Sequence, residues 1–395
     1  MSKKLNDVVI TTALRTPIGT YKGSLKGLDA HKLGALVIKE VLLNSKLKGD
    51  DIDEVIMGHV LTSGCGQNPA RQASIEAGVP VSKSSHIINQ VCGSGLRSIV
   101  SAYQSICLKE NKIIIAGGQE NMSKAPHAIF YRDEKKLSEN KLIDTMLNDG
   151  LIDSFNNYHM GMTAENIASK YKISRDEQDL FALNSQEKTQ KAFKEKKFQN
   201  ELIKIKIVEN QKKILFEKDE HPRGDIKLED LKKLKTVFKE NGTVTAGNSS
   251  GINDGAAATI LMSREESELR SIKPLAKIVS WATCGVEPSL MGLGPIPAVK
   301  IALKKAGWEI DDIDLFEINE AFAAQSIAVI RELKIPKENV NVNGGAIALG
   351  HPIGMSGTRI VVTLIHELIR QNKSKGCATL CIGGGMGIAI CIEKN

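Results

Sequence analysis

Two stretches of the chain repeat one pattern, LGALVIKEVLLNSKLKGDDIDEVIMG at residues 33–58 and PIPAVKIALKKAGWEIDDIDLFEIN at residues 295–319. In each, apolar residues recur at helical spacing, and a turn with Asp-Asp-Ile-Asp then leads into an apolar run typical of a strand. Each repeat also continues to an apolar run that ends in glycines, KIIIAGG (112–118) and ATLCIGGG (378–385). Because helices and strands alternate regularly, the pattern predicts an α/β protein with parallel sheets covered by helices, built twice.

A different region interrupts the first repeat. We expect an N-terminal half made of residues 1–120 and 249–270, a C-terminal half of residues 271–395, and an inserted loop domain over 121–248. The insertion is rich in Lys and Glu and is expected to be mostly helical with extended pieces. It is interpreted as a lid or ligand-binding element, with a purely structural excursion as the alternative. The segment after it, TAGNSSGINDGAAATILMS (245–263), is expected to form a turn, a small-residue helix start and the last strand of the first half.

Composition indicates a soluble globular protein rather than a membrane or nucleic-acid-binding protein. Of 395 residues, 42% are hydrophobic and 25% charged, and no apolar run approaches the ~20 residues of a membrane span. Seven scattered cysteines, an odd number, favour a reducing compartment, and we expect a cytoplasmic protein. The net charge of +7 reflects a lysine-rich surface or a small polyanionic ligand, whereas 4% aromatic residues and the lack of a known motif argue against nucleic acid.

A cysteine stands where a strand is expected to meet a helix. HIINQVC (86–92) is strand-like, Gly93-Ser94-Gly95 permits a tight turn, and the following residues have helical apolar spacing. A helix N-terminus presents unpaired N–H groups and partial positive charge, which favour a thiolate. Cys92 is therefore a candidate nucleophile, and a buried structural cysteine is the alternative.

A candidate base for that thiol lies in the second repeat. His351 sits in the glycine-dense stretch NVNGGAIALGHPIGMSGTR (341–359), where backbone can approach a ligand closely. Counted from Asp53 and Asp314 of the two repeats, Cys92 and His351 occupy nearly equivalent positions. If the halves pack about a pseudo-twofold axis, both residues face one cleft.

Two further motifs carry polar chemistry at strand ends. In LCIGGGMG, Cys381 is expected at the end of a buried strand, either as a core cysteine or as a second acid/base thiol. Backbone N–H groups of the following glycines, Gly383 among them, could hold a developing oxyanion. In FEINEAFAAQ, Asn319, Glu320 and Phe322 are expected to end a strand and open a helix, where a side-chain amide could orient a water or a carbonyl. A zinc site at Cys377 and Cys381 is a minor alternative, because no second paired motif accompanies them.

The motifs VCGSGL, GGQENMS, NEAFA, GGAIALGHPIGMSG and CIGGGMG, in this order, resemble the thiolase family. The resemblance covers essentially the whole chain. It implies two βαβαβαββ halves stacked as a five-layer α-β-α-β-α core, with an inserted loop domain that binds CoA. Ketoacyl synthases share the doubled fold but use a cysteine with two histidines, so the NEAF and C-x-G-G-G motifs point away from them.

The resemblance implies an acyltransferase that condenses two acetyl-CoA molecules reversibly to acetoacetyl-CoA and CoA. Cys92 would carry the acetyl group, His351 would activate its sulfur, and Cys381 would remove the α-proton of the second acetyl-CoA. Asn319, through a water, and His351 would form one oxyanion hole, and the N–H groups of Cys92 and Gly383 the other. The CoA esters are substrates, so no cofactor and no metal is expected.

Other residues implied by the resemblance concern the substrate. His159 and Met160, in NYHMGMTAEN, resemble the short-chain biosynthetic subgroup, in which they close the acyl pocket. Arg223 and Ser250 resemble CoA-binding positions, with a surface salt bridge as the alternative for Arg223. The remaining expected CoA contacts are Leu151, Phe238, Ala246, Ala321 and Phe322.

Two rival functions remain at this point. One is a broader, degradative 3-ketoacyl-CoA thiolase. The other is a thiolase-like CoA- or lipid-binding protein without catalysis, disfavoured because Cys92, Asn319, His351 and Cys381 are all present. The resemblance also implies a homotetramer, assembled as a dimer of dimers, with acetyl-CoA, acetoacetyl-CoA and CoA as its small-molecule partners and no membrane partner.

Overall fold

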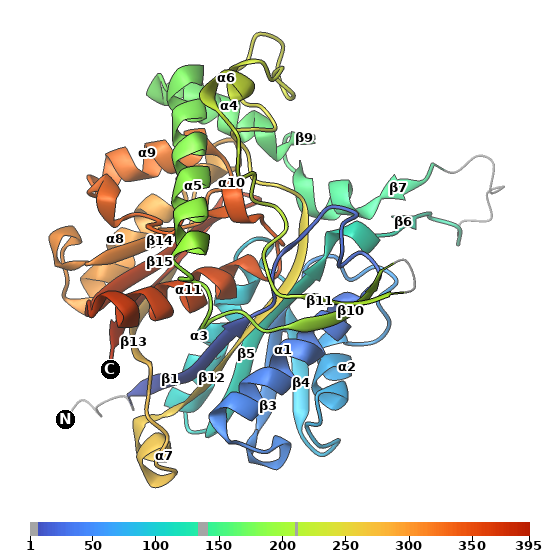
Figure 1. Cartoon of the computed structure of the whole chain (residues 1–395), viewed down its shortest axis with the longest axis vertical. Helices are drawn as coiled ribbons and strands as arrows, with labels where there is room; N and C mark the ends of the chain where they lie inside the picture. Colours follow the sequence, from blue (N-terminus) through green and yellow to red (C-terminus); the bar gives the residue numbers. More distant parts are fainter. Residues whose placement is uncertain (1–6, 133–140, 210–211) are drawn as a thin grey trace.

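The computed structural model describes residues 7–132, 141–209 and 212–395. Its main sheet is ten-stranded, in the order β14-β15-β16-β13-β1-β12-β5-β3-β4, with β2 paired to β12. The N-terminal half forms one side of the molecule and the C-terminal half the other, as the blue-to-cyan and orange-to-red ribbons of Figure 1 show. The expected α/β duplication is confirmed.

The N-terminal half follows the predicted βαβαβαββ order. Strands β12, β5, β3 and β4 lie side by side; β3 is parallel to β4 and β5, and β12 is antiparallel to β5. Helices α1 and α2 pack against each other on one face of these strands, and α3 lies on the other face. The elements are β1 (Val8–Arg15), β2 (Gly19–Thr20), α1 (Ala30–Ser45), β3 (Glu54–Gly58), α2 (Pro69–Glu76), β4 (Ser84–Ile88), α3 (Ser94–Cys107), β5 (Ile113–Asn121), β12 (Asn253–Ser263) and α7 (Arg264–Leu269).

The C-terminal half repeats this order with one reduced strand. The position equivalent to β4 is taken by Val340, which makes a single parallel bridge to Phe316. Helices α8 and α9 cover the outer face of its strands. The elements are β13 (Ala276–Gly285), α8 (Pro295–Ala306), β14 (Leu315–Ile318), α9 (Ala323–Leu333), α10 (Ala346–Leu349), α11 (Ser356–Gln371), β15 (Lys375–Ile382) and β16 (Met386–Lys394).

The repeated Asp-Asp-Ile-Asp has the same structural role twice. Asp51 and Asp312 each accept the backbone N–H of the residue three positions earlier, which closes a 3-10 turn. Asp53 and Asp314 each accept two backbone N–H groups at the start of the neighbouring strand, β5 or β15. Short 3-10 turns span Gly49–Asp51, Met122–Lys124, Pro288–Leu293, Ile310–Asp312 and Lys337–Asn339.

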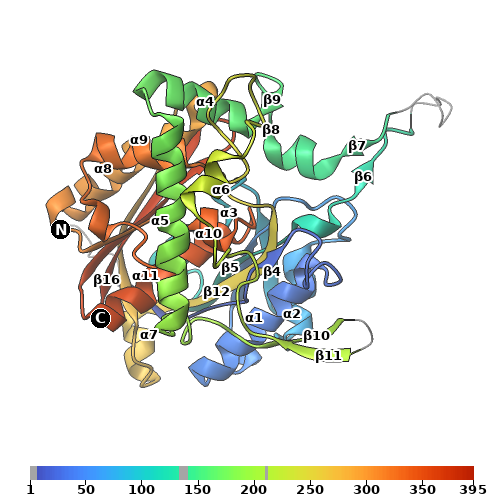
Figure 2. The ribbon, with the colours of Figure 1, turned by 45° about the horizontal axis from the view of Figure 1, so that its top comes forward.

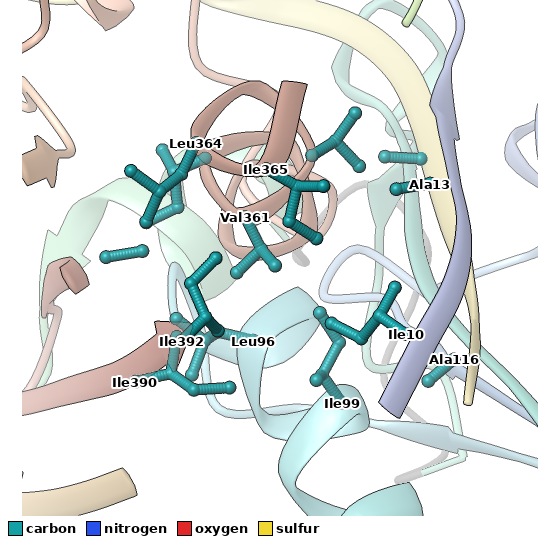
Figure 3. Packing of buried hydrophobic residues seen from close by; sticks show 14 of the residues in the cluster. Ile10, Ala13, Leu96, Ile99, Ala116, Val361, Leu364, Ile365, Ile390 and Ile392 are labelled. Atoms are coloured by element: carbon teal, nitrogen blue, oxygen red, sulfur yellow. The ribbon is translucent and has the colours of Figure 1, made fainter. Parts of the chain in front are cut away.

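Helices α3 and α11 form the middle layer of the five. They pack against each other between the two half-sheets, where Leu96 and Ile99 of α3 meet Val361 and Ile365 of α11 in one apolar cluster (Figure 3). Helix α11 is buried nearly all round, its Thr358 and Arg359 included, because a sheet lies on each side of it. Burial of each such aliphatic side chain contributes about 1.5–3 kcal/mol to the free energy of folding. The half-sheets themselves join only through two residue pairs of β1 and β13.

The insertion contributes two long helices and three hairpins, and α5 stands upright along the molecule in Figure 1. Helices α4 and α5 pack on α9, and α5 also packs on α10, so the insertion rests mainly on the C-terminal half. Its elements are β6 (His127–Ala128), β7 (Ile143–Asp144), a π-helix (Leu147–Leu151), β8 (Ile152–Asp153), β9 (Tyr158–His159), α4 (Met160–Tyr171), α5 (Arg175–Lys194), β10 (Ile205–Glu209), β11 (Lys212–Phe216) and α6 (Leu228–Lys232).

Two local expectations were wrong. The small residues Ala256–Ala258 belong to strand β12 and do not start a helix. They are fully buried and lie so close to β5 that a Cβ on Gly117 would meet the Ala257 carbonyl oxygen at 2.3 Å. Small side chains therefore serve strand packing here. The strand that was expected to continue from His86 to Cys92 ends at Ile88, and a turn lies between β4 and Cys92.

Candidate active site

A cavity of about 660 Å³ lies where the two halves and the insertion meet. Cys92 comes from the N-terminal half, His351 and Gly383 from the C-terminal half, and Arg223 from the insertion. Asn319 and Cys381 are buried and do not line it. The other predicted residues on its wall are Leu151, His159, Met160, Phe238, Ala246, Ser250, Ala321 and Phe322.

Cys92 lies in the turn between β4 and α3. The preceding Val91 has φ of 44°, and Ser94 at the start of α3 donates its hydroxyl to the Val91 carbonyl at 2.6 Å. The backbone N–H groups of Gly383 and of Cys92 face the sulfur, but burial outweighs them and raises the pKa of Cys92 to about 11. The free enzyme therefore holds a thiol at neutral pH, which corrects the expectation of a resting thiolate.

His351 is fixed on three sides in the loop between α10 and α11. Its backbone N–H donates to Asn253 Oδ1 at 3.0 Å, and its Nδ1 lies 2.5 Å from Ser356 Oγ. Because the Ser356 hydroxyl donates to the Pro352 carbonyl at 2.8 Å, its oxygen accepts from Nδ1–H. Nε2 is then left with a lone pair, and Asn319 Nδ2 approaches it at 3.4 Å. Burial, and secondarily Arg359, lower the pKa of His351 to about 3, so the ring is neutral and able to accept a proton.

Asn319 and Cys381 lie behind the wall at the ends of neighbouring parallel strands. Asn319 follows β14, and its backbone N–H donates to Thr379 of β15 at 3.0 Å. Its side-chain Oδ1 is buried without a hydrogen-bond partner among the described residues. Burial, and then the neighbouring Cys92 sulfur, raise the pKa of the Cys381 thiol well above its usual range. Two thiols, an imidazole and an amide thus converge from both halves.

The end of the cavity beside the sulfurs is narrow and apolar. Met160, Phe238 and Phe322 pack in one cluster with Cys381. The His159 ring stacks on Phe238 at 4.5 Å and accepts the Gly161 N–H at 3.0 Å, capping α4. The cap fixes the histidine ring against the phenyl ring, so the insertion supplies a rigid wall at this end.

Polar side chains also line the cavity. Arg223 and Ser250 line it, and the Arg223 backbone N–H donates to Gln186 Oε1 at 2.9 Å. Within the described ranges, the Arg223 guanidinium has no carboxylate partner. A salt bridge therefore does not account for this arginine, and its charge is available to a ligand.

Several cavity residues were missed by the sequence reasoning. His221, Tyr21, Met291 and Ile353 also line the wall. His221 has a weak signal, its place two residues before Arg223, and burial lowers its pKa to about 4. Tyr21 has none, since only the tertiary fold brings the β2 region to the cavity.

Comparison with known families agrees with this geometry. Residues 8–265 match the family described as "Thiolase, N-terminal domain", and residues 272–394 match "Thiolase, C-terminal domain". The chain belongs to the thiolase family.

Curated relatives of this thiolase share about half of its residues. It is 51% identical over 397 residues to the cytosolic acetyl-CoA acetyltransferase of Rattus norvegicus, with 100% of both chains covered. It is 50% identical to the acetyl-CoA acetyltransferase of Paracoccus denitrificans, covering 99% of this chain and 100% of that one.

Solved structures of other thiolases have nearly the same fold as this chain. The crystal structure of the Bacillus anthracis acetyl-CoA acetyltransferase matches with a TM-score of 0.97 and 44% identity, covering 99% of each chain. Human mitochondrial 3-ketoacyl-CoA thiolase in complex with CoA matches with a TM-score of 0.95 and 43% identity, covering 99% of this chain and 98% of that one.

Among the described helices, none has the length and apolar character to cross a bilayer.

Proposed function

We propose that this thiolase is an acetyl-CoA acetyltransferase that condenses two acetyl-CoA molecules to acetoacetyl-CoA and CoA, and runs the reaction in reverse. The observation that carries the proposal is the single cavity whose wall holds Cys92, His351 and Gly383, with Asn319 and Cys381 directly behind it. The similarity over full length to acetyl-CoA acetyltransferases supports the same reading. We propose no cofactor and no metal beyond the CoA esters.

In the first step, Cys92 Sγ attacks the thioester carbonyl of acetyl-CoA and its proton passes to Nε2 of His351. The CoA sulfur leaves and takes up that proton, so acetyl-Cys92 and free CoA result. The N–H groups of Gly383 and Cys92, which face the sulfur, are placed to stabilise the oxyanion. A neutral His351 with a free Nε2 suits this role, because it accepts the proton only as the sulfur attacks.

In the second step, the Cys381 thiol gives its proton to Nε2 of His351, and the resulting thiolate takes a proton from the α-carbon of a second acetyl-CoA. The resulting carbanion attacks the acetyl carbonyl on Cys92, the new carbon–carbon bond forms, and the Cys92 sulfur leaves as a thiolate that regains the proton. Asn319, through a water, and the protonated Nε2 of His351 would hold the enolate oxygen, and Asn319 Oδ1, which has no hydrogen-bond partner among the described residues, supports a bound water there. Acetyl-Cys92 cannot ionise, so a charge on the Cys92 sulfur no longer opposes the ionisation of Cys381. Cys381 is thereby easier to ionise once the acetyl-enzyme exists.

The apolar end of the cavity favours short acyl groups. Met160, Phe238 and Phe322 crowd the space beside the two sulfurs, so an acetyl group fits and a longer acyl chain would meet these side chains. The 43% identity to human mitochondrial 3-ketoacyl-CoA thiolase keeps the broader thiolase as a rival. The positive charge of Arg223, which has no carboxylate partner among the described residues, suits the CoA phosphates.

The test is a thiolysis assay with acetoacetyl-CoA and CoA, run beside Cys92→Ala. We expect turnover in the wild type, an acetyl adduct on Cys92 by mass spectrometry, and neither in the variant. Absence of both activity and adduct in the wild type would disprove the proposed function. Comparable kcat/KM for acetoacetyl-CoA and a medium-chain 3-ketoacyl-CoA would instead favour the broader thiolase.

We propose a cytoplasmic homotetramer, a dimer of dimers, as the working assembly. Strand β4 is the last strand of the sheet and carries a partly exposed backbone edge, which commonly pairs with a second chain. The β6–β7 hairpin projects from the body (Figure 2), and Phe130 and Leu142 beside its strands are 75% and 67% exposed. Mass photometry would distinguish a tetramer from a dimer or monomer.

A further inference from the structure

The motif GGQENMS contains a buried carboxylate that the proposed chemistry leaves without a role. Glu120, near the end of β5, is fully buried. Its Oε1 accepts the Leu61 N–H at 3.2 Å, and its Oε2 accepts the N–H groups of Val60 at 3.1 Å and Gly354 at 2.9 Å. His59 Nε2 lies 3.3 Å from Oε1. Burial raises the pKa of Glu120 to about 8, and the three backbone N–H groups oppose the shift.

One of these bonds crosses between the duplicated halves. Gly354 belongs to the loop between α10 and α11, three residues after His351, whereas Glu120 belongs to the N-terminal half. The backbones of β5 and of the His351 loop approach each other very closely here. A Cβ added to Gly118 would lie 2.0 Å from the Gly354 carbonyl oxygen. Glu120 therefore joins the histidine loop to the half that carries Cys92.

The other two bonds fix the wall beside the nucleophile. Val60 and Leu61 form an apolar cluster with Ile353, and Cys92 packs against that cluster. The Glu120 carboxylate thus holds two backbone segments. One is Val60–Leu61 beside Cys92, and the other is Gly354 in the loop that carries His351. Asn253 adds a second anchor from the same half, through the His351 N–H.

We propose that Glu120 is a positioning residue, which sets the His351 loop and the Val60–Leu61 wall at the distance that proton transfer between Cys92 and His351 requires. The inference rests on the proposed function. Proton transfer depends steeply on geometry, so a shift of the loop lowers the rate of the chemical step more than it weakens CoA binding, for which Arg223 and Ser250 are the proposed contacts.

The test compares Glu120→Gln and Glu120→Met with a matched control, Asp254→Asn. Gln keeps one acceptor oxygen and turns an NH₂ group toward at least one of the three backbone N–H groups. Met keeps a similar volume and removes both acceptors. Asp254 is a buried carboxylate on the neighbouring strand β12, where it accepts the N–H and the hydroxyl of Ser123 and faces the Met122 N–H.

For thiolysis we expect kcat to fall about threefold to tenfold in Glu120→Gln and more than tenfold in Glu120→Met, with KM for CoA within threefold of wild type. Hydrogen exchange read by mass spectrometry should be faster in the peptide containing Gly354 in both variants and unchanged in Asp254→Asn. The control should keep wild-type kcat.

The outcomes separate the two proposals. An inactive wild-type enzyme removes the proposed function, whatever the variants do. With an active wild type, a folded Glu120→Gln that keeps wild-type kcat and wild-type exchange at Gly354 overturns the positioning role. Equal losses of kcat in Asp254→Asn would also overturn it, since they would reduce the effect to general destabilisation. If Glu120→Met does not fold, Glu120→Gln decides.

Discussion

Removing the Ser356 hydroxyl should slow catalysis through the tautomer of His351. In the structure, Ser356 Oγ accepts from Nδ1–H at 2.5 Å while donating to Pro352, which leaves Nε2 free to take the Cys92 proton. In Ser356→Ala, Nδ1–H is buried without an acceptor, or the proton moves to Nε2, where it faces the Asn319 amide. Either outcome costs about 1–3 kcal/mol, the usual penalty of a buried unpaired donor. If that penalty falls on the reactive tautomer, kcat drops about 5- to 150-fold.

The assay measures steady-state thiolysis and the rate of acetyl-Cys92 formation, by quenched-flow mass spectrometry. Both rates should fall in Ser356→Ala, and Ser356→Thr, which retains a hydroxyl, should recover most of the loss. Ser326→Ala is the matched control, because Ser326 is also buried in a helix but its hydroxyl hydrogen-bonds only to Gln325 among the described residues. Wild-type rates in a folded Ser356→Ala, or an equal loss in the Ser326 control, would refute the tautomer argument.

Two further predictions concern the thiols. Cys381→Ser should leave acetylation of Cys92 detectable while condensation falls about 10²- to 10⁴-fold, as expected for loss of a general base; parallel loss of both steps would contradict the assigned roles. Because burial raises the pKa of Cys92 to about 11, the neutral thiol dominates below that pH, and alkylation of Cys92 by iodoacetamide should keep rising with pH beyond 9. A rate that levels off below pH 8 would instead indicate a thiolate paired with a protonated histidine.

The duplicated architecture was legible in the sequence because its signals are local. Helical spacing, the Asp-Asp-Ile-Asp turns and the glycine-ended strands each depend on residues close together in the chain. Asp53 and Asp314, for example, each hold the first residues of a neighbouring strand in the same way. Residues Ala256–Ala258 were predicted to start a helix, but they lie in strand β12. Small residues suit both structures, and only the close approach of β5 favours the strand.

The residues of the candidate site also fall into two groups, those that short motifs predict and those that only the tertiary structure brings to the cavity. Cys92, Asn319, His351 and Cys381 could be named from short motifs, since each follows an apolar run and stands in a distinctive turn. His221 and Tyr21 could not, because they reach the cavity only through the packing of β2 and the insertion.

By itself, the sequence identified the candidate residues for the proposed chemistry and predicted that two similar α/β units would hold them. The tertiary structure alone decided their charge states, because burial between two sheets makes a thiolate costly at Cys92 and keeps the His351 ring neutral. It alone also revealed Glu120 as a link between the halves, since a carboxylate that holds Gly354 and Val60 acts over distances in the chain that no local pattern records.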